Sequence, residues 1–172
     1  AERLFEFPPV AELPPAAVRK ALRDPVHAAG AKFEDPAIAK IIDLTKGFPY
    51  FVQEWGYQAW NHASNARVTI KDVAEATDTA LRRLDDNFFR VRFDRLTPRE
   101  KQFMRAMAHL GPGQQRIGDI ADVLGVKVNG LGPIRARLIH KGMIYSPAYG
   151  DLAFTVPLFH DFMRRVMPKL EF

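Results

Sequence analysis

The stretch from Thr97 to Val156 decides the fold, and it opens with Thr97-Pro98-Arg99-Glu100. In this tetrapeptide the threonine can cap a helix, the proline occupies the first helical position, and the glutamate can reach back to the capping residue. Apolar residues follow at helical spacing until Gly111-Pro112-Gly113 stops the run. We therefore predict a helix between Thr97 and Gly111.

Two more helices and a hairpin follow in the same stretch. Apolar residues at helical spacing predict a second helix from Ile117 to Leu124, closed by a glycine, and a third between Asn129 and Lys141. Residues 143–145 and 152–156 are short β-prone runs on either side of the turn sequence 146–151. Three helices followed by a small hairpin are typical of a winged helix-turn-helix, which usually presents its last helix to a nucleic acid groove.

The first half of the chain has the pattern of a small all-α bundle. The first predicted helix is introduced by Pro14-Pro15 and broken at Asp24-Pro25, and the second begins at Asp35-Pro36 and ends at Lys46-Gly47. The third starts at Pro49, and the fourth is capped by Thr69. The predicted fold class is thus mainly α. A helical bundle over residues 1–88 is followed by a winged helix-turn-helix with a short β-hairpin over residues 89–172.

Positive charge is concentrated in the second half. Residues 89–172 hold 14 Lys and Arg against 7 Asp and Glu, a formal charge of +7, whereas residues 1–88 hold 11 against 13, or −2. A basic winged helix is the expected electrostatic footprint for phosphate, although surface arginines also keep a small domain soluble. We therefore expect double-stranded DNA as a weakly bound partner.

Five side chains are the predicted DNA contacts. Two of them lie at the ends of helices, where phosphate contacts are usual, and the others lie on or near the outward face of the third helix: Arg116, Lys127, Asn129, Arg137 and His140. Arg135 lies nearer the buried flank of this helix and is a candidate for an ion pair with Asp119 or Asp122.

Two features favour a different use of the same fold. The turn sequence 146–151 contains no Lys or Arg, and Gly130, Gly132 and Pro133 weaken the first turn of the third helix as an element that reads bases. In this alternative the winged helix is a protein-interaction module or an inter-domain clamp in a signalling ATPase.

The chain resembles a group of ATPases over nearly all of its length. The residues that carry the resemblance are Trp60 and the segments 45–53 (TKGFPYFVQ), 138–145 (LIHKGMIY) and 154–159 (FTVPLF). They look like the C-terminal part of prokaryotic AAA+/STAND-type ATPases, which include the archaeal ATPase family and, more distantly, origin-recognition-type initiators. The resemblance implies that the first half is the helical lid of an ATPase whose core lies upstream of Ala1, with residues 1–7 as a remnant of that core.

The resemblance also implies a nucleotide contact at Gly47-Phe48-Pro49, because a Gly-x-Pro at the start of the lid helix touches the adenine in such proteins. From the residues alone, a tight corner between two helices is the better explanation of the same tripeptide. Many relatives place an arginine at the start of this helix to touch the γ-phosphate, whereas this chain has Tyr50 and Phe51 there. ATP with Mg²⁺ is therefore expected in a full-length parent, and no tight binding by this chain alone.

Several classes of chemistry have no motif in the sequence. There is no Gly-x-x-x-x-Gly-Lys-Ser/Thr loop and no apolar strand ending in Asp-Glu, so we expect no hydrolysis by this chain and assign no catalytic residue. The five histidines share no metal-ligand spacing, so no metal site is predicted. Cysteine is absent and no apolar run approaches the roughly 20 residues that span a bilayer, so we expect a cytoplasmic protein with no membrane partner.

Overall fold

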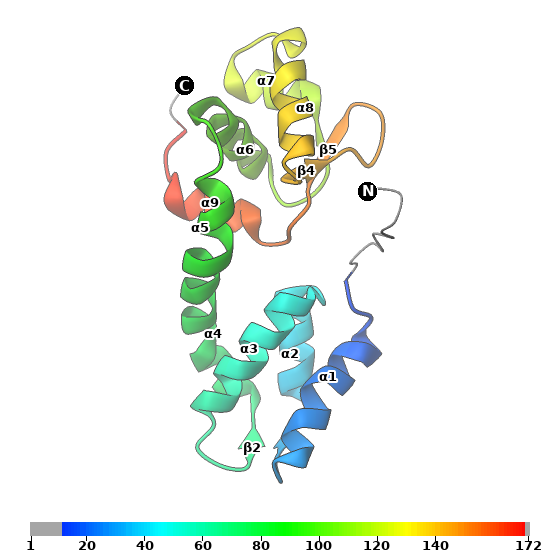
Figure 1. The fold of residues 1–172 in the computed structure, drawn as a ribbon, viewed down its shortest axis with the longest axis vertical. Coiled ribbons are helices and arrows are strands. Elements are labelled where there is room, and N and C mark those ends of the chain that lie inside the picture. The colour runs from blue at the N-terminus through cyan, green and yellow to red at the C-terminus, as the bar shows by residue number, and fades with distance from the viewer. Residues whose placement is uncertain (1–11, 171–172) are drawn as a thin grey trace, which may run out of the picture. The chain divides into compact units, whose positions relative to one another are not determined.

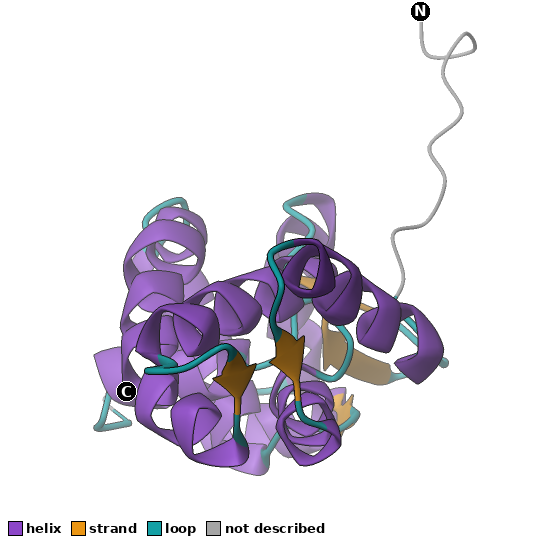
Figure 2. Ribbon diagram, turned by 90° about the horizontal axis from the view of Figure 1, so that it is seen from below, coloured by secondary structure: helices purple, strands orange, loops and turns teal. Residues whose placement is uncertain are grey.

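The structure, a computed structural model, describes residues 12–170 of the 172-residue chain. It is mainly helical with a few short strands (Figure 1, Figure 2), which confirms the predicted fold class of a helical bundle followed by a small hairpin. The chain divides into two compact units between Leu84 and Asp85, here termed the N-terminal and C-terminal units. The predicted core remnant at residues 1–7 lies outside the described residues.

The N-terminal unit packs its helices around one core. Its elements are α1 (Pro15–Ala28), β1 (Lys32–Phe33), α2 (Asp35–Thr45), α3 (Pro49–His62), β2 (Arg67–Val68) and α4 (Ile70–Leu84). The two short strands pair in parallel, with Phe33 opposite Val68. Every helix contributes fully or almost fully buried side chains to the core, including Val18, Ile38, Ile41, Phe51, Trp55, Val73 and Leu84.

The predicted helix starts of the N-terminal unit are confirmed. Prolines occupy the first or second position of α1, α2 and α3, where a backbone N–H would have no partner inside the helix. At the start of α4, the backbone N–H of Thr69 donates to Asp72 Oδ2 at 2.7 Å, and Asp72 N lies 3.4 Å from Thr69 Oγ1. This reciprocal pair caps α4.

The predicted break at Asp24-Pro25 is wrong, because α1 continues to Ala28 with Pro25 inside it. Pro25 cannot donate to the carbonyl four residues earlier, which weakens the helix at that turn. However, Val26 lies one turn beyond Leu22 on the buried face and is only 8% exposed. Burial of this valine stabilises the last turn by about 1–2 kcal/mol, which offsets much of the cost of the proline.

The corner between α2 and α3 requires a glycine. Lys46 and Gly47 both have left-handed backbone conformations, with φ of 51° and 77°. The N–H of Leu13 donates to the Gly47 carbonyl at 2.8 Å. A Cβ atom on residue 47 would clash with the carbonyl oxygen of Leu13. The segment that enters α1 is thus held against this corner at a distance that only glycine allows.

The C-terminal unit combines short helices with a three-stranded antiparallel sheet. Its elements are η2 (Asp85–Phe89, a π-helix), α5 (Arg90–Phe93), α6 (Pro98–Leu110), β3 (Gln115–Arg116), α7 (Ile117–Leu124), η3 (Val128–Leu131, a 3₁₀-helix), α8 (Gly132–His140), β4 (Ile144–Tyr145), β5 (Asp151–Phe154) and α9 (Phe159–Val166). Strand β5 lies between β3 and β4. The hairpin β4–β5 was predicted from the sequence, whereas β3 and α9 were not.

Helix α9 closes the core of this unit through aromatic side chains. The ring of Phe89 lies 5.7 Å from that of Phe159 and 5.3 Å from that of Phe162. Two arginines also join α9 to α6: Arg164 Nε donates to the Ala108 carbonyl at 2.7 Å, and Arg105 Nε donates to the Met167 carbonyl at 2.6 Å. Each helix therefore supplies a cation to the C-terminal carbonyls of the other, which favours both helix ends.

The glycine corner yields a stability prediction. Gly47→Ala should lower the free energy of unfolding of the N-terminal unit by about 2–4 kcal/mol, since it adds a backbone clash to the cost of a left-handed alanine. Both tryptophans, Trp55 and Trp60, lie in this unit, so urea unfolding followed by tryptophan fluorescence measures it selectively.

Gly30→Ala is the matched control for that substitution. Gly30 has a similar φ of 73°, but an added Cβ there would meet no atom within 4 Å. This variant should lose only about 1 kcal/mol, the cost of the backbone conformation alone. Equal losses in the two variants would show that the contact with Leu13 contributes nothing.

Candidate nucleic-acid interface

Helix α8 and the turn before it form the centre of the candidate interface. Leu131 and Leu138 are buried and Ile134 is half-buried, so they face the core as the sequence predicted. The third predicted helix does not start as an α-helix, because residues 128–131 form a 3₁₀ turn. Gly130 and Gly132 have low helix propensity and Pro133 lacks an N–H, so the regular α-helix begins only at Gly132.

Four of the five predicted contact residues are exposed and make no hydrogen bond or ion pair among the described residues. Arg116 ends β3, Lys127 and Asn129 lie just before and within η3, and His140 is the last residue of α8. Within residues 12–170, none of these four side chains has a hydrogen bond or an ion pair. They are free to contact a ligand in solution.

Arg137, the fifth predicted contact, forms an ion pair with Glu100. Its Nε lies 3.3 Å from Oε1 of Glu100, a carboxylate that is completely buried, while 52% of the arginine side chain remains exposed. Lys141 lies one turn further along the chain, and its Nζ is 2.7 Å from Oε2 of the same carboxylate. Lys141 Nζ also donates to the Arg95 carbonyl at 2.8 Å. Glu100 therefore neutralises part of the positive charge around the end of α8.

Glu100 also serves the capping box that opens α6. The Thr97 N–H donates to Glu100 Oε2 at 2.8 Å, and Glu100 N lies 3.4 Å from Thr97 Oγ1. Burial is the largest single influence on this carboxyl and raises its pKa. Hydrogen bonds from Lys141 and Thr97 together outweigh it and lower the pKa of Glu100 from 4.5 to about 2. The buried group is thus ionised at neutral pH and fully partnered.

The predicted ion pair of Arg135 with Asp119 or Asp122 is wrong. Arg135 Nη2 instead donates to the hydroxyl of Ser146 at 3.2 Å, on the loop that joins β4 to β5. The side chain extends toward the hairpin because the half-buried position of Arg135 faces that loop. Helix α8 is thereby tied to the hairpin loop as well as to α6.

The tripeptide Gly47-Phe48-Pro49, predicted to touch adenine, is only partly associated with a cavity. A cavity of about 560 Å³ is lined by Gly47 together with Leu13, Pro14, Ile42 and Lys46, but not by Phe48 or Pro49. The Phe48 ring packs at 4.7 Å from the ring of Phe51. Pro49 is half-buried at the first position of α3. The structure therefore brings only Gly47 of the three to this cavity.

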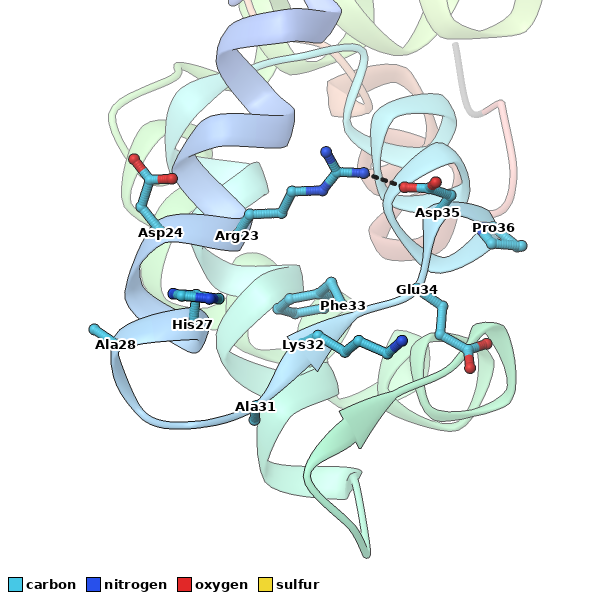
Figure 3. A pocket seen from close by; sticks show the side chains of 10 residues that line it. All are labelled: Arg23, Asp24, His27, Ala28, Ala31, Lys32, Phe33, Glu34, Asp35 and Pro36. Carbon is cyan, nitrogen blue, oxygen red and sulfur yellow. Dashed lines mark hydrogen bonds and ion pairs between the residues drawn. The ribbon is translucent and has the colours of Figure 1, made fainter.

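A second cavity in the N-terminal unit was not anticipated from the sequence. It has a volume of about 790 Å³ and lies between the end of α1, β1 and the start of α2 (Figure 3). Arg23 is paired with Asp35 across it, and Glu34 is paired with Arg67 at 3.4 Å. Its acidic side chains, Asp24, Glu34 and Asp35, outnumber its Lys and Arg, so it does not favour a polyphosphate.

Residues 12–170 offer neither a metal site nor a membrane span. No group of three or more His, Cys, Asp or Glu side chains in this part of the chain could hold a metal ion. No helix within the same residues is long and apolar enough to cross a membrane.

The Glu100 contacts predict an acid-sensitive C-terminal unit. The folded pKa of about 2 lies below the ordinary 4.5, so the stabilisation is fully present above pH 4.5 and is lost as pH falls toward 2. The free energy of unfolding of the C-terminal unit should fall by about 3 kcal/mol between pH 4.5 and 2. Glu100→Gln should remove most of this pH dependence. All five methionines lie in the C-terminal unit, so methyl NMR signals recorded during urea unfolding report on it alone.

Asp122→Asn is the control for Glu100→Gln. Asp122 is exposed on α7 and has no ion pair within the described residues, so this variant should retain the acid sensitivity of the original protein. The interpretation of Glu100 would be wrong if Glu100→Gln lost stability between pH 4.5 and 2 as steeply as Asp122→Asn.

Comparisons with known proteins give one family model and a set of solved structures. The family model "Domain of unknown function (DUF8462)" matches residues 86–163. No curated protein matches the sequence. The chain is similar to the Thermotoga maritima RuvB Holliday junction branch migration motor, with 13% identity and a TM-score of 0.42 over 83% of this chain and 46% of that one. A lysine-to-arginine mutant of Thermotoga maritima RuvB matches with 15% identity and a TM-score of 0.41, over 81% of this chain and 45% of that one. The chain therefore spans less than half the length of either structure.

Proposed function

We propose that the C-terminal unit is a winged helix-turn-helix that binds double-stranded DNA, mostly through its phosphates. The order of α6, β3, α7, α8 and the β4–β5 hairpin is the order of that fold. In such modules the helix that corresponds to α8 is presented to a groove of the duplex.

The observation that carries the proposal is a set of four exposed side chains that have no partner among the described residues and lie on successive elements of the C-terminal unit. Arg116 is at the end of β3, Lys127 and Asn129 are just before and within η3, and His140 is at the end of α8. Residues 89–172 also carry a formal charge of +7. A surface of this charge and composition suits a phosphate backbone with a small number of contacts to base edges.

The proposed contacts divide into two kinds. Arg116 and Lys127 would bind phosphates, because they lie at the start of α7 and just before η3. Asn129 and His140 would lie near base edges, where amide and imidazole groups can form hydrogen bonds. Arg137 would contribute a weaker phosphate contact, since Glu100 already shares its charge.

A second candidate function is a protein-interaction surface, and a specific observation favours it. Val126 and Val128, in the turn between α7 and α8, are 48% and 44% exposed. Val126 lines a cavity of about 360 Å³ together with Leu124, Leu131 and Ile134, and Arg99 and Gln102 also line it. A mainly apolar cavity next to an exposed valine is suited to a protein partner rather than to phosphate.

For the N-terminal unit, the proposed function is the helical lid of an AAA+/STAND-type ATPase whose nucleotide-binding core precedes it. ATP with Mg²⁺ would then be held mainly by that core. The lid would contribute the corner at Gly47-Phe48-Pro49, where the N-terminus of α3 has no side-chain cap among the described residues. Nucleotide state in the core would change the position of the lid and so control DNA binding by the C-terminal unit.

Fluorescence anisotropy on a labelled duplex at several salt concentrations tests the DNA-binding proposal. Two full phosphate contacts and a weaker one at Arg137 predict a slope of log affinity against log salt between about −1.8 and −2.7. Arg116→Ala and Lys127→Ala should each flatten this slope by about 0.9, while Arg137→Ala should change it less because Glu100 already shares its charge.

Lys20→Ala is the matched control, since Lys20 is an exposed cation in the N-terminal unit with no ion pair among the described residues. It removes the same charge from the chain and should leave the slope unchanged. No binding at low salt, or equal slopes in all four variants, would exclude the DNA-binding proposal and favour a protein partner.

Calorimetric titration with ATP and Mg²⁺ tests the lid proposal. An apolar contact of adenine with the α2–α3 corner is worth about 1–2 kcal/mol, whereas micromolar affinity requires about 8 kcal/mol. We therefore expect this chain to bind ATP more weakly than about 1 mM. Micromolar binding would mean that the chain holds a complete nucleotide site, contrary to the lid proposal.

A further inference from the structure

We infer that Tyr149, on the loop between β4 and β5, stacks on an unpaired nucleobase at a duplex end or branch. The inference rests on the proposed nucleic-acid binding and adds to it the kind of DNA that the unit prefers. The loop joins the two strands of the hairpin and projects from the helices of its unit (Figure 1, orange).

Tyr149 is a large aromatic side chain that takes no part in the packed core of its unit. It is fully exposed, and within residues 12–170 it has no ring contact and no hydrogen bond. Tyr145, on β4 of the same hairpin, is 49% exposed. Both faces of the Tyr149 ring are therefore open to a flat ligand.

The backbone under Tyr149 is held in place by several hydrogen bonds. Asp151 N donates to the Ala148 carbonyl at 3.1 Å, which closes a turn with Tyr149 and Gly150 at its centre. Gly150 has a φ of 82°, so the turn is of type II with the tyrosine at its second position. The Gly150 carbonyl in turn accepts from Ile117 N at 2.9 Å.

Ser146 fixes the same turn from its other side. Its hydroxyl lies 2.9 Å from both the Ala148 and the Asp151 carbonyl oxygens and accepts a hydrogen bond from Arg135 of α8. The aromatic ring is therefore presented from a preorganised turn. Binding would order one side chain and little backbone, which keeps its entropic cost low.

The chemistry around the ring indicates the partner. The loop 146–150 has no Lys or Arg, so the loop itself is not suited to a phosphate contact. Two arginines adjoin it, however: Arg135 through Ser146, and Arg116 opposite Asp151 in the β3–β5 register. An exposed ring on a loop that has arginines on the neighbouring helix and strand is suited to a ligand that combines negative charge with flat rings, and a nucleic acid has both.

The same geometry favours an unpaired base over a closed duplex. Bases inside a duplex are stacked on both faces and cannot accept a tyrosine ring, whereas a base in a single-stranded arm offers a free face. Stacking of one base on one aromatic side chain typically changes affinity by roughly 5- to 100-fold. Tyr149 would thus increase affinity for DNA that carries an unpaired arm, without altering the phosphate contacts.

The test compares a blunt duplex with the same duplex carrying a six-nucleotide single-stranded arm, by fluorescence anisotropy at one salt concentration. The original chain should bind the armed duplex roughly 10-fold more tightly. Tyr149→Ala should abolish this preference and leave blunt-duplex affinity unchanged, while Tyr149→Phe should retain it because the ring is kept. Photo-crosslinking from 5-iodouracil in the arm should label Tyr149 directly.

Tyr57→Ala is the matched control, because Tyr57 is a 58% exposed tyrosine on α3 of the N-terminal unit and should not affect the preference. If Tyr149→Ala prefers the armed duplex as strongly as the original chain does, the inference is overturned while duplex binding stands. If neither DNA binds at low salt, the proposed function fails together with the inference.

Discussion

The C-terminal unit depends on one buried carboxylate. Glu100 has no solvent-accessible side-chain surface, yet it remains ionised because Thr97, Arg137 and Lys141 all donate to it or pair with it. A buried charge that loses a partner costs several kcal/mol, so any displacement of α8 relative to α6 is strongly opposed. The position of α8, and with it the candidate interface, is therefore a consequence of where Glu100 lies.

This arrangement has an electrostatic consequence for the surface. The Glu100 carboxylate that positions α8 also neutralises part of the charge of Arg137 and Lys141. These two side chains are therefore less available to phosphate. Arg116 and Lys127, the two proposed basic contacts that have no partner among the described residues, lie outside α8 on elements that precede it. Contacts from flanking elements orient a module on a DNA backbone more than they read sequence, so the proposed DNA binding would be weak and salt-dependent.

Local sequence signals predicted much of the fold, and tertiary contacts account for what they missed. The capping box at Thr97 and the prolines at helix starts were predictable because the interacting groups are within four residues of each other. The partners of Glu100 lie 37 and 41 residues away, and no periodicity indicates such a pair. Strand β3 has only two residues, too few for an alternating pattern, and Pro25 is retained inside α1 because Val26 packs in the core.

Two side-chain contacts of α8, with Ser146 and with Glu100, keep the backbone of the candidate interface in place while its exposed side chains stay adaptable. Glu100 contacts the helix through Arg137, and Ser146 of the hairpin loop contacts it through Arg135, two residues earlier. Because the Ser146 hydroxyl also closes the turn under Tyr149, movement of α8 would displace that ring as well. The helix and the loop therefore present one preorganised surface, on which only the exposed side chains remain to be ordered by a ligand.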